Sequence, residues 1–258
     1  MIQFPHISPE IVRIGPLAIR WYGMMYLVGF GASYLLVSRQ IKRRGLPLGR
    51  DFVESLYTYL ILGLLLGARL GYAVFYNLPF YLSHPFDILA VWHGGMSFHG
   101  GLIGTVLAGF LFCKRSKIDF WLIADLVVVP APIGLALGRL GNFINGELYG
   151  RVTDAPWAMV FPDGGPLPRH PSQLYEIFME GLVLFIIMWS LKDRKFSPGA
   201  LTAIFIMLYG TFRFVLEFFR EPDPQLGYII FNSITMGQLL SASMVAAGLG
   251  ILFLRRAK

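Results

Sequence analysis

Apolar residues occur along this chain in runs of about twenty positions that alternate with short polar segments. A run of that length matches the distance that an α-helix must cover to cross the hydrocarbon core of a bilayer. A helix also keeps its backbone hydrogen bonds internal, as lipid surroundings require. The pattern predicts seven membrane-spanning helices, at about residues 18–38, 53–77, 95–113, 119–138, 172–191, 199–218 and 236–254.

Composition places the chain in the same class. Of its 258 residues, 55% are hydrophobic and only 14% are charged, whereas soluble globular chains carry about 25% charged residues. We therefore expect an all-α integral membrane protein, folded as a single membrane-embedded domain over residues 1–258. The longest polar segment, at about residues 140–171, is rich in Gly and Pro and is expected to form a small external cap.

The net charge of +7 could indicate a nucleic-acid partner, so the positions of the basic residues matter. Most of them lie in four clusters between or after the predicted spans, all on one side of a seven-span chain. The clusters comprise Arg39, Lys42, Arg43, Arg44 and Arg50, then Lys114, Arg115 and Lys117, then Lys192, Arg194 and Lys195, then Arg255, Arg256 and Lys258. By the positive-inside rule that side is the cytoplasm, which places the N-terminus outside and the C-terminus inside. No nucleic-acid partner is expected.

The remaining basic residues are all arginines, and they fall on the outer side or in the outer halves of spans. They are Arg13, Arg20, Arg69, Arg139, Arg151, Arg169, Arg213 and Arg220. A guanidinium offers a fixed fork that fits phosphate or carboxylate, whereas a lysine is a mobile point charge. The pattern therefore predicts recognition of an anion on the outer face. Snorkelling at the membrane interface explains Arg13, Arg20 and Arg151 equally well when each is taken singly.

The richest polar stretch is GRLGNFINGELYG at 138–150, which begins at the outer end of the fourth predicted span. A charged residue at membrane depth costs about 2.5–3.5 kcal/mol on insertion scales, so Arg139 should be paired or functional. A structural network between Arg139 and Glu147 is one explanation, and a phosphate cradle is the other. The further candidate binding residues of this stretch are Asn142, Asn145 and Gly150.

HPSQLYE, at 170–176, opens the fifth predicted span with several polar side chains. Ser172 fits the N-cap of that helix, and capping alone could explain it. Capping does not explain Gln173, Tyr175 and Glu176, which follow on an otherwise apolar helix. The candidate substrate-binding residues of this stretch are His170, Ser172 and Gln173.

YGTFRFVLEFFR, at 209–220, ends the sixth predicted span. Arg213 and Glu217 are spaced i,i+4, so they can form an ion pair on one face of the helix. Such a pair would leave Arg213 able to reach a lipid phosphate as well. Tyr209 and Arg220, at the two ends of this stretch, are further candidates for substrate binding.

His99 lies in SFHGGLIG, at 97–104, where neighbouring glycines leave its ring approachable. A lone histidine is more often a packing residue than a catalyst. Here imidazole is also the side chain best matched to proton transfer near neutral pH, so His99 is a catalytic candidate. The other histidines show no short ligand spacing and the chain has one cysteine, Cys113, so no metal site is expected.

These polar stretches converge in a seven-span chain. Spans three and five begin on the outer side, and spans four and six end there, so their polar ends lie at one depth and on one face. Tyr22, at the outer start of the first span, joins them. Convergent polar groups in an apolar bundle are the usual mark of a binding site. Asp125 and Glu180 lie deeper and do not fit this arrangement.

Four of these motifs in order closely resemble those of the prolipoprotein diacylglyceryl transferases. They are HGGLIG at 99–104, GRLGNFINGELYG at 138–150, HPSQLYE at 170–176 and YGTFRFVLEFFR at 209–220, and RWYGMMYLVGF at 20–30 matches as well. The resemblance implies transfer of the sn-1,2-diacylglyceryl group from phosphatidylglycerol to the lipobox cysteine of a prolipoprotein. The products are a thioether and glycerol phosphate, as the first step of lipoprotein maturation. It also implies a bacterial cytoplasmic (inner) membrane location and no cofactor.

Carried over residue by residue, the essential histidine and two essential arginines of that family fall on His99, Arg139 and Arg213. Its supporting polar positions fall on Tyr22, Asn142, Glu147, Gly150, Tyr209, Glu217 and Arg220. As a hypothesis, His99 accepts or relays the thiol proton while the two arginines grip the leaving phosphate. Glu147 and Glu217 are then expected to orient the arginines.

Three other functions compete with this interpretation. A transporter also carries charges inside the membrane, but it should place polar residues through the full depth of the bilayer. A structural scaffold would need neither His99 nor outward arginines. A phospholipase or acyltransferase would use water or a hydroxyl as acceptor, although no serine elbow of the GxSxG kind occurs in the sequence.

Overall fold

The computed structural model describes residues 2–5, 7–15, 17–90, 94–221, 228–230 and 234–256. Tertiary contacts divide the chain into two compact units, which are described separately. Unit 1 comprises Met1–Val37 and Ala124–Lys258, and unit 2 comprises Ser38–Ile123. Two helices, α1 (Trp21–Arg43) and α5 (Phe120–Val128), run from one unit into the other.

Helices make up most of both units, and the strands are short and paired in twos. Unit 2 also contains α2 (Arg50–Phe75), α3 (Leu78–Ser83), the 3₁₀-helix η1 (Pro85–Leu89) and α4 (Phe98–Ser116). The helices of unit 1 are α6 (Ala131–Ile144), α7 (Ser172–Glu176), the π-helix η3 (Ile177–Val183), α8 (Leu184–Leu191), α9 (Ala200–Leu216) and α10 (Met236–Arg256). Its strands are β1 (Ile2–Gln3), β2 (Glu10–Ile14), β3 (Leu17–Arg20), β4 (Met159–Val160), β5 (Tyr228–Ile230) and β6 (Ile234–Thr235).

The seven predicted apolar runs lie mainly on helix, although the first begins within strand β3, and this confirms the expected all-helical class. Within the described residues, three helices are long and apolar enough to cross a membrane. They are Arg50–Phe75, Ser172–Leu191 and Met236–Arg255. The pair α5 and α6 would make a fourth if it counts as one broken span, and α9 is a shorter apolar helix.

The fourth predicted span is not one straight helix. It breaks between α5 and α6, where the helix axis bends by 47°. Pro130 lies at this break, and Pro132 follows in the first turn of α6. A proline removes a backbone donor and clashes with the preceding turn, which is an ordinary cause of a sharp kink.

The fifth predicted span also departs from a regular α-helix, because η3 widens its middle into a π-helix. Such widened turns are rare and occur frequently at functional sites. Gly181 in η3 faces Ala136 of α6 so closely that a Cβ on the glycine would overlap the alanine methyl. The widened turn therefore lies directly against α6.

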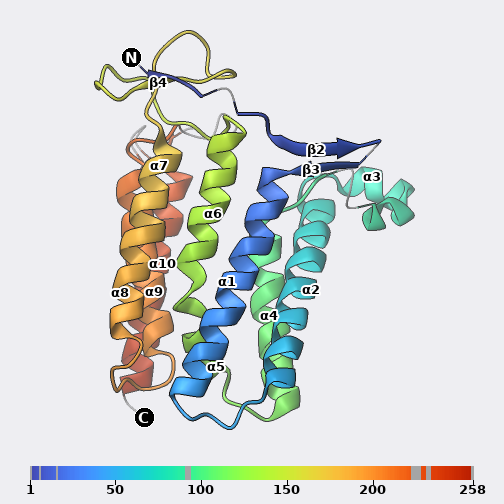
Figure 1. Ribbon diagram of the computed structural model, residues 1–258, viewed down its shortest axis with the longest axis vertical. Helices are drawn as coiled ribbons and strands as arrows, with labels where there is room; N and C mark the ends of the chain where they lie inside the picture. Colours follow the sequence, from blue (N-terminus) through green and yellow to red (C-terminus); the bar gives the residue numbers. More distant parts are fainter. Residues whose placement is uncertain are drawn as a thin grey trace. The chain divides into compact units, whose positions relative to one another are not determined.

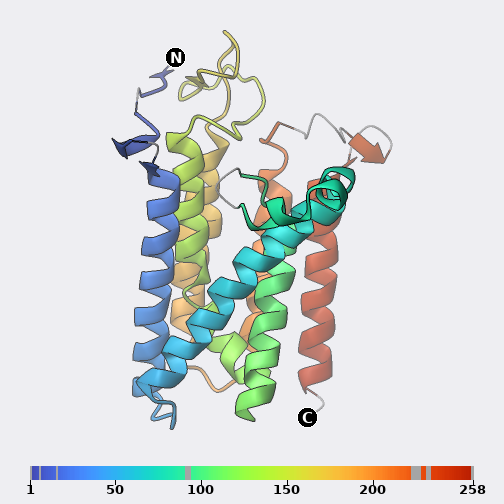
Figure 2. The same ribbon diagram turned by 90° about the vertical axis from the view of Figure 1, so that its right-hand side faces the viewer.

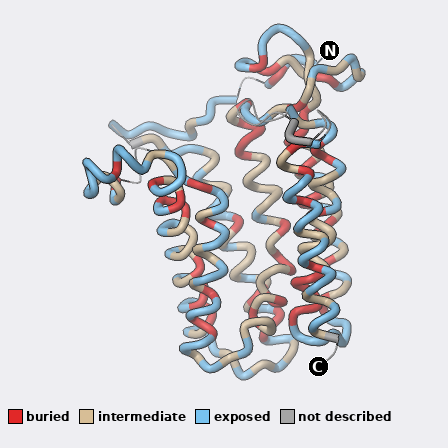
Figure 3. Tube along the Cα trace, turned by 180° about the vertical axis from the view of Figure 1, so that it is seen from behind, coloured by how far each residue is buried: buried red, intermediate tan, exposed pale blue. Residues whose placement is uncertain are grey.

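Unit 1 is a bundle in which α6, the α7–η3–α8 helix and α9 run side by side (Figure 1). One buried hydrophobic cluster of this bundle contains Val129, Leu184, Met188 and Leu201, each at most 3% exposed. Buried positions line the inward faces of the helices, while the outward faces are exposed (Figure 3). Exposed large apolar side chains on these outward faces are what a lipid-facing surface requires.

Asp125, which had no evident role in the sequence, caps the start of α9. Its carboxylate accepts hydrogen bonds from the backbone N–H of Gly199 at 2.7 Å and of Thr202 at 2.8 Å. It also accepts one from the Thr202 hydroxyl at 2.7 Å. The first N–H groups of a helix lack intrahelical partners, and Asp125 satisfies them from a neighbouring helix.

The segment that the sequence predicts as a cap folds over one end of unit 1 (Figure 1). Strand β4 pairs in parallel with β1, so the N-terminal strand joins this segment. Phe4, Phe143 and Phe161 form a small buried aromatic cluster between the N-terminal strand, α6 and the cap. Strands β2 and β3 form a separate antiparallel hairpin that leads into α1.

Unit 2 is built on an antiparallel crossing of α2 and α4 at glycines (Figure 2). Gly63, Gly67 and Gly71 of α2 face Gly100 and Gly104 of α4, and a Cβ at any of these positions would meet backbone atoms of the partner helix. The two helices therefore pack closely, backbone against backbone. Small residues at such a contact let two backbones approach closely, and the resulting van der Waals packing favours helix association in lipid.

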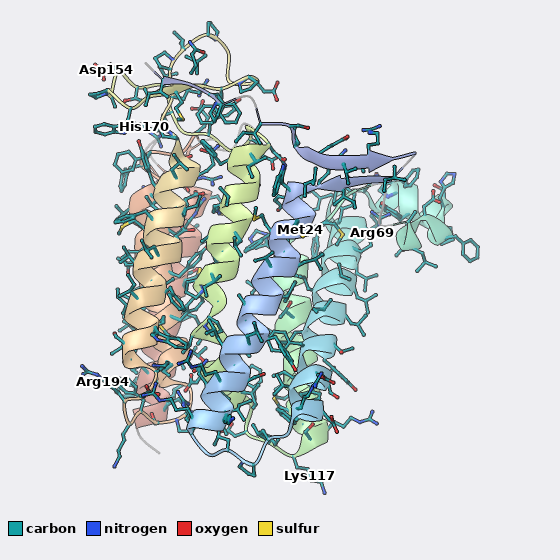
Figure 4. All side chains as sticks on the ribbon, viewed as in Figure 1. Met24, Arg69, Lys117, Asp154, His170 and Arg194 are labelled. Carbon is teal, nitrogen blue, oxygen red and sulfur yellow. The ribbon has the colours of Figure 1, made fainter. Side chains whose placement is uncertain are left out.

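Arg69, one of the predicted outward arginines, is a buried structural residue within unit 2. It donates hydrogen bonds to the backbone carbonyls of Asp87 at 2.6 Å, Ile88 at 2.8 Å and Ala90 at 3.0 Å, and also reaches Gly94 and Gly95. Its guanidinium thereby holds the backbone of the segment between α3 and α4 in place. Arg69 lies at the opposite end of the unit from Lys117 (Figure 4). Arg69 is therefore explained without an anion.

The glycine contact yields a prediction about stability. Replacing Gly67 by leucine should destabilise the protein by about 1–3 kcal/mol or more, since backbone atoms of Gly100 and Gly104 cannot move aside. Thermal unfolding in detergent measures the loss. Gly31→Ala is the matched control, because a Cβ at Gly31 meets nothing within 4 Å. Equal melting temperatures for the two variants would contradict the packing argument.

Candidate functional site

The candidate site is a buried cluster of arginines and carboxylates in unit 1, with Glu176 at its centre. The Glu176 side chain is fully buried at the end of α7. Its Oε1 accepts hydrogen bonds from Arg213 Nη1 at 2.7 Å and from Arg220 Nη1 at 2.8 Å. Arg139 Nε lies 2.9 Å from Oε2. One carboxylate therefore binds three guanidiniums from α6, from α9 and from the segment after α9.

A second carboxylate, Glu217, completes the pairing of two of these arginines. Its Oε2 accepts from Arg213 Nη2 at 2.9 Å, which confirms the i,i+4 pair expected from the sequence. Arg220 Nε lies 3.7 Å from the same oxygen. The Thr235 hydroxyl donates to Oε1 at 3.0 Å, and the carboxylate occupies the space that a side chain at Gly237 would fill. Arg213 is thus held between two carboxylates in a fixed orientation.

Arg139 is less completely paired than the other two. Its Nε–H is not aligned with Glu176 Oε2, so the contact is an ion pair without a hydrogen bond. Within the part of the chain that the structure describes, the two terminal amino groups of Arg139 have no hydrogen-bond partner, and 21% of the side chain is exposed. A guanidinium held at one edge with a free fork is suited to a planar or phosphate anion.

Glu147 does not pair with Arg139, contrary to one explanation drawn from the sequence. Its Oε1 accepts hydrogen bonds from the side-chain amides of Asn142 at 2.8 Å and Asn145 at 3.0 Å. The partner of Arg139 is Glu176, which comes from a different helix. The expectation that Glu147 orients Arg139 through direct contact is therefore wrong.

Ser172 and Gln173 hold the chain that carries Glu147. The Ser172 hydroxyl donates to the carbonyl of Leu148 at 3.1 Å, and the Gln173 amide donates to the carbonyl of Glu147 at 2.7 Å. The N-cap of α7 is Pro171, so the prediction that Ser172 caps this helix is wrong. Both side chains are buried and support the turn that follows α6.

Gly150 joins the predicted cap to the end of α9. It forms an isolated bridge with Arg220, and its N–H donates to the carbonyl of His170 at 2.8 Å. A Cβ at Gly150 would overlap the backbone of Phe219 and the side chain of His170. Arg151 donates from Nε to the Arg220 carbonyl at 2.7 Å. These contacts place the backbone of Arg220 beside the charged cluster.

His170 lies beside the cap, at the same end of unit 1 as Asp154 (Figure 4). Its Nδ1 is 3.0 Å from the Tyr175 hydroxyl, which accepts a hydrogen bond from Trp157 Nε1 at 2.6 Å. Its ring also packs edge-on against Phe219. Partial burial lowers the pKa of His170, which favours the neutral ring near pH 7.

Two predicted tyrosines lie on the helices of unit 1. The Tyr22 hydroxyl is 3.2 Å from that of Tyr26, and the Tyr22 ring packs on Gly141 of α6. Tyr209 stacks on Phe205 within α9, one turn before Arg213. Tyr22 therefore contacts the helix that carries Arg139.

His99 belongs to unit 2 and is described within that unit alone. It is exposed in the first turn of α4, where Ser97 is the N-cap and accepts from the N–H of Gly100 at 3.2 Å. Its ring packs edge-on against Phe98. Among the described residues, the ring nitrogens of His99 have no hydrogen-bond partner.

Removing the central carboxylate should destabilise unit 1. Glu176→Gln deletes the charge that three arginines share, and breaking a buried ion pair by removing one partner costs about 3–5 kcal/mol. Thermal unfolding in detergent measures the effect. Glu54→Gln, which removes an exposed ion pair with Arg50, is the control and should melt like the wild type. A Glu176→Gln variant as stable as the control would show that Glu176 does not hold the cluster.

Comparison with known proteins assigns the chain to a family. A family model described as prolipoprotein diacylglyceryl transferase matches residues 9–254. Three relatives are named phosphatidylglycerol–prolipoprotein diacylglyceryl transferase. The relative from Desulfotalea psychrophila is 56% identical over 257 residues, with 97% of this chain and 94% of the relative covered. The relative from Geobacter sulfurreducens is 55% identical, with 96% and 95% covered, and that from Nitratidesulfovibrio vulgaris is 50% identical, with 98% and 96% covered. The chain therefore belongs to the prolipoprotein diacylglyceryl transferase family.

Proposed function

We propose that the chain transfers the sn-1,2-diacylglyceryl group of phosphatidylglycerol to the lipobox cysteine thiol of prolipoproteins. The relatives are named for phosphatidylglycerol and prolipoprotein, which supports these two substrates. The observation that carries the proposal is the Arg139 fork, which has no partner among the described residues and is held beside two further guanidiniums by Glu176. Such a cluster fits the phosphate of a lipid headgroup at a membrane boundary.

The reaction is a substitution at a glycerol carbon. The thiol sulfur forms a bond to that carbon as the carbon–oxygen bond to phosphate breaks, and the phosphate departs as glycerol phosphate with one more negative charge. Arg139 and Arg213 bind the phosphate oxygens and stabilise that additional charge in the transition state. Because Glu176 and Glu217 already fix Arg213, little reorganisation is needed when the charge develops.

A free thiol is largely protonated near pH 7, so the attacking sulfur must lose a proton. The family resemblance makes His99 an essential residue, and we assign the removal of this proton to it, a role that its exposed position at the start of α4 supports. Further contacts to the lipid headgroup and the peptide are assigned to the polar residues carried over from the family motifs. Those carried over are Tyr22, Asn142, Glu147, Gly150, Tyr209, Glu217 and Arg220, and the polar sequence motifs add Asn145, His170, Ser172 and Gln173.

We place the chain in a bacterial cytoplasmic membrane with seven crossings, the N-terminus outside, the C-terminus inside and residues 140–171 as an external cap. In unit 1, Arg194 and His170 lie at opposite ends of the helices, and in unit 2 Lys117 and Arg69 do so (Figure 4). The lysine-containing ends are cytoplasmic by the positive-inside rule. The charged cluster of unit 1 then lies toward the outer face.

A transporter is a weaker alternative. It requires polar residues along a path through the membrane, and the sequence places only Asp125 and Glu180 deeper than the other unusual polar residues. The structure accounts for Asp125 as the cap of α9. The polar cluster of unit 1 otherwise gathers at one end of its helices, which favours a lipid enzyme.

The transfer reaction can be measured directly. The purified protein in phosphatidylglycerol vesicles should add a diacylglyceryl mass to a synthetic lipobox peptide, and not to its Cys→Ser counterpart. Arg139→Lys keeps the charge but loses the fork, and the rate should fall about 10²–10³-fold, as when one preorganised donor is lost. Mass spectrometry of the peptide follows both. A wild type that modifies neither peptide would overturn the proposed function.

The role of His99 is tested in the same assay. His99→Ala should abolish transfer at neutral pH while leaving the melting temperature unchanged, because the ring is exposed and its one aromatic contact among the described residues is with Phe98. His84→Ala, another exposed histidine of unit 2, is the control and should retain wild-type activity. Full activity of His99→Ala would assign the proton to another acceptor.

A further inference from the structure

Glu180 is a buried carboxyl that the proposed reaction does not use. It lies on the π-helix η3, one turn beyond Glu176, and only 1% of the residue is exposed. Neither of its oxygens has a hydrogen-bond partner among the described residues. Its nearest cation is Arg213, whose Nη1 is 4.0 Å from Oε1. Burying a carboxylate without hydrogen bonds is costly, so this position needs an explanation.

The charges around Glu180 come from every helix packed against η3. Arg139 faces it from α6, Glu176 from α7, and Tyr209 and Arg213 from α9. Arg220 faces it from the segment after α9, and α8 contributes no ionisable side chain. Glu176 accepts two hydrogen bonds from guanidiniums at Oε1, and the nearby Glu217 accepts hydrogen bonds from Arg213 and Thr235. Glu180 is the carboxyl that remains without hydrogen bonds.

The net charge of the cluster determines what the Glu180 carboxyl can do. The described cluster holds three guanidiniums, of Arg139, Arg213 and Arg220. They face three carboxyls, of Glu176, Glu217 and Glu180. With all three carboxyls ionised the cluster is neutral. An anionic phosphate bound to the arginines would give it a net negative charge, which a water-poor site strongly disfavours.

We propose that Glu180 is a positioning residue that takes up one proton when the phosphate of the lipid headgroup binds the arginine cluster. In the empty site the carboxylate balances Arg213. In the occupied site the phosphate replaces that charge, and the neutral Glu180 carboxyl no longer competes for the charge of Arg213, which Glu176 and Glu217 keep in place. The step forms and breaks no covalent bond of the lipid, and the proton comes from solvent. This inference rests on the proposed function, since it requires a phosphate at the arginines.

The proposal predicts the direction in which the affinity for the lipid changes with pH. Binding that takes up a proton is strongest at low pH, where Glu180 is already protonated in the empty site. Affinity then falls as pH rises, by at most about tenfold per pH unit for one proton. The phosphodiester of phosphatidylglycerol does not titrate in this range, so the lipid itself adds no such dependence.

Calorimetry measures the proton directly. Monomeric dioctanoyl phosphatidylglycerol is titrated into the detergent-solubilised full-length chain, without peptide, in two buffers of different ionisation enthalpy. The difference in heat gives the number of protons taken up, from about pH 5.5 to about pH 8.5, a range in which a buried carboxyl can titrate. Wild type and Glu54→Gln should approach one proton per lipid at the upper end. Glu180→Gln should take up none and should bind with an affinity that does not change with pH.

Two results would overturn the inference. One is binding by the wild type with no proton uptake at any pH, and the other is unchanged uptake in Glu180→Gln. Glu180→Met, a second neutral variant of similar volume, gives the same comparison if the glutamine variant does not fold. The vesicle transfer assay separates this inference from the function. A wild type that transfers diacylglyceryl but takes up no proton leaves the proposed function intact and removes only the role of Glu180.

Discussion

The structure of unit 1 depends on one buried carboxylate that three guanidiniums share. Glu176 can be buried because Arg139, Arg213 and Arg220 surround it, and the arginines can lie near an apolar bundle because Glu176 neutralises part of their charge. Neither side of this arrangement is stable without the other. It also ties α6, α7 and the end of α9 to a single point, so the helices are positioned by the same contacts that position the charges.

Two local features let the helices reach this point. The π-turn in η3 and the absence of a side chain at Gly181 bring the Glu176 and Glu180 backbone against α6. At the other side, Gly237 leaves room for the Glu217 carboxylate at the start of α10. Glycines in this chain therefore serve two purposes: in unit 2 they join α2 to α4 through backbone contact, and in unit 1 they make space beside charged groups.

The helices could be predicted from the sequence because apolar runs of spanning length have few other stable forms in lipid. The Arg213–Glu217 pair could be predicted because its partners are four residues apart on one helix. The partner of Arg139 could not be predicted, because Glu176 comes from another helix. Glu147 is closer to Arg139 in the sequence and was therefore the expected partner. The role of Asp125 was hidden for the same reason: its partners, Gly199 and Thr202, lie far along the chain. The sequence shows that HPSQLYE has more polar residues than helix capping requires. Their separate roles are seen only in the fold, where Ser172 and Gln173 support a turn and Glu176 binds arginines.

The incomplete pairing of the cluster is what distinguishes a site from a structural ion network. A purely structural network gains most when every donor and acceptor is satisfied, as around Arg69, whose guanidinium is enclosed by backbone carbonyls. Around Glu176 the described residues leave both terminal amino groups of Arg139 without a partner, and they leave the oxygens of Glu180 without a donor. A buried carboxylate without a hydrogen-bond donor is costly, and that cost is relieved when Glu180 takes up a proton as an anion binds the amino groups of Arg139. The binding of one phosphate therefore explains both the amino groups of Arg139 and the carboxyl of Glu180.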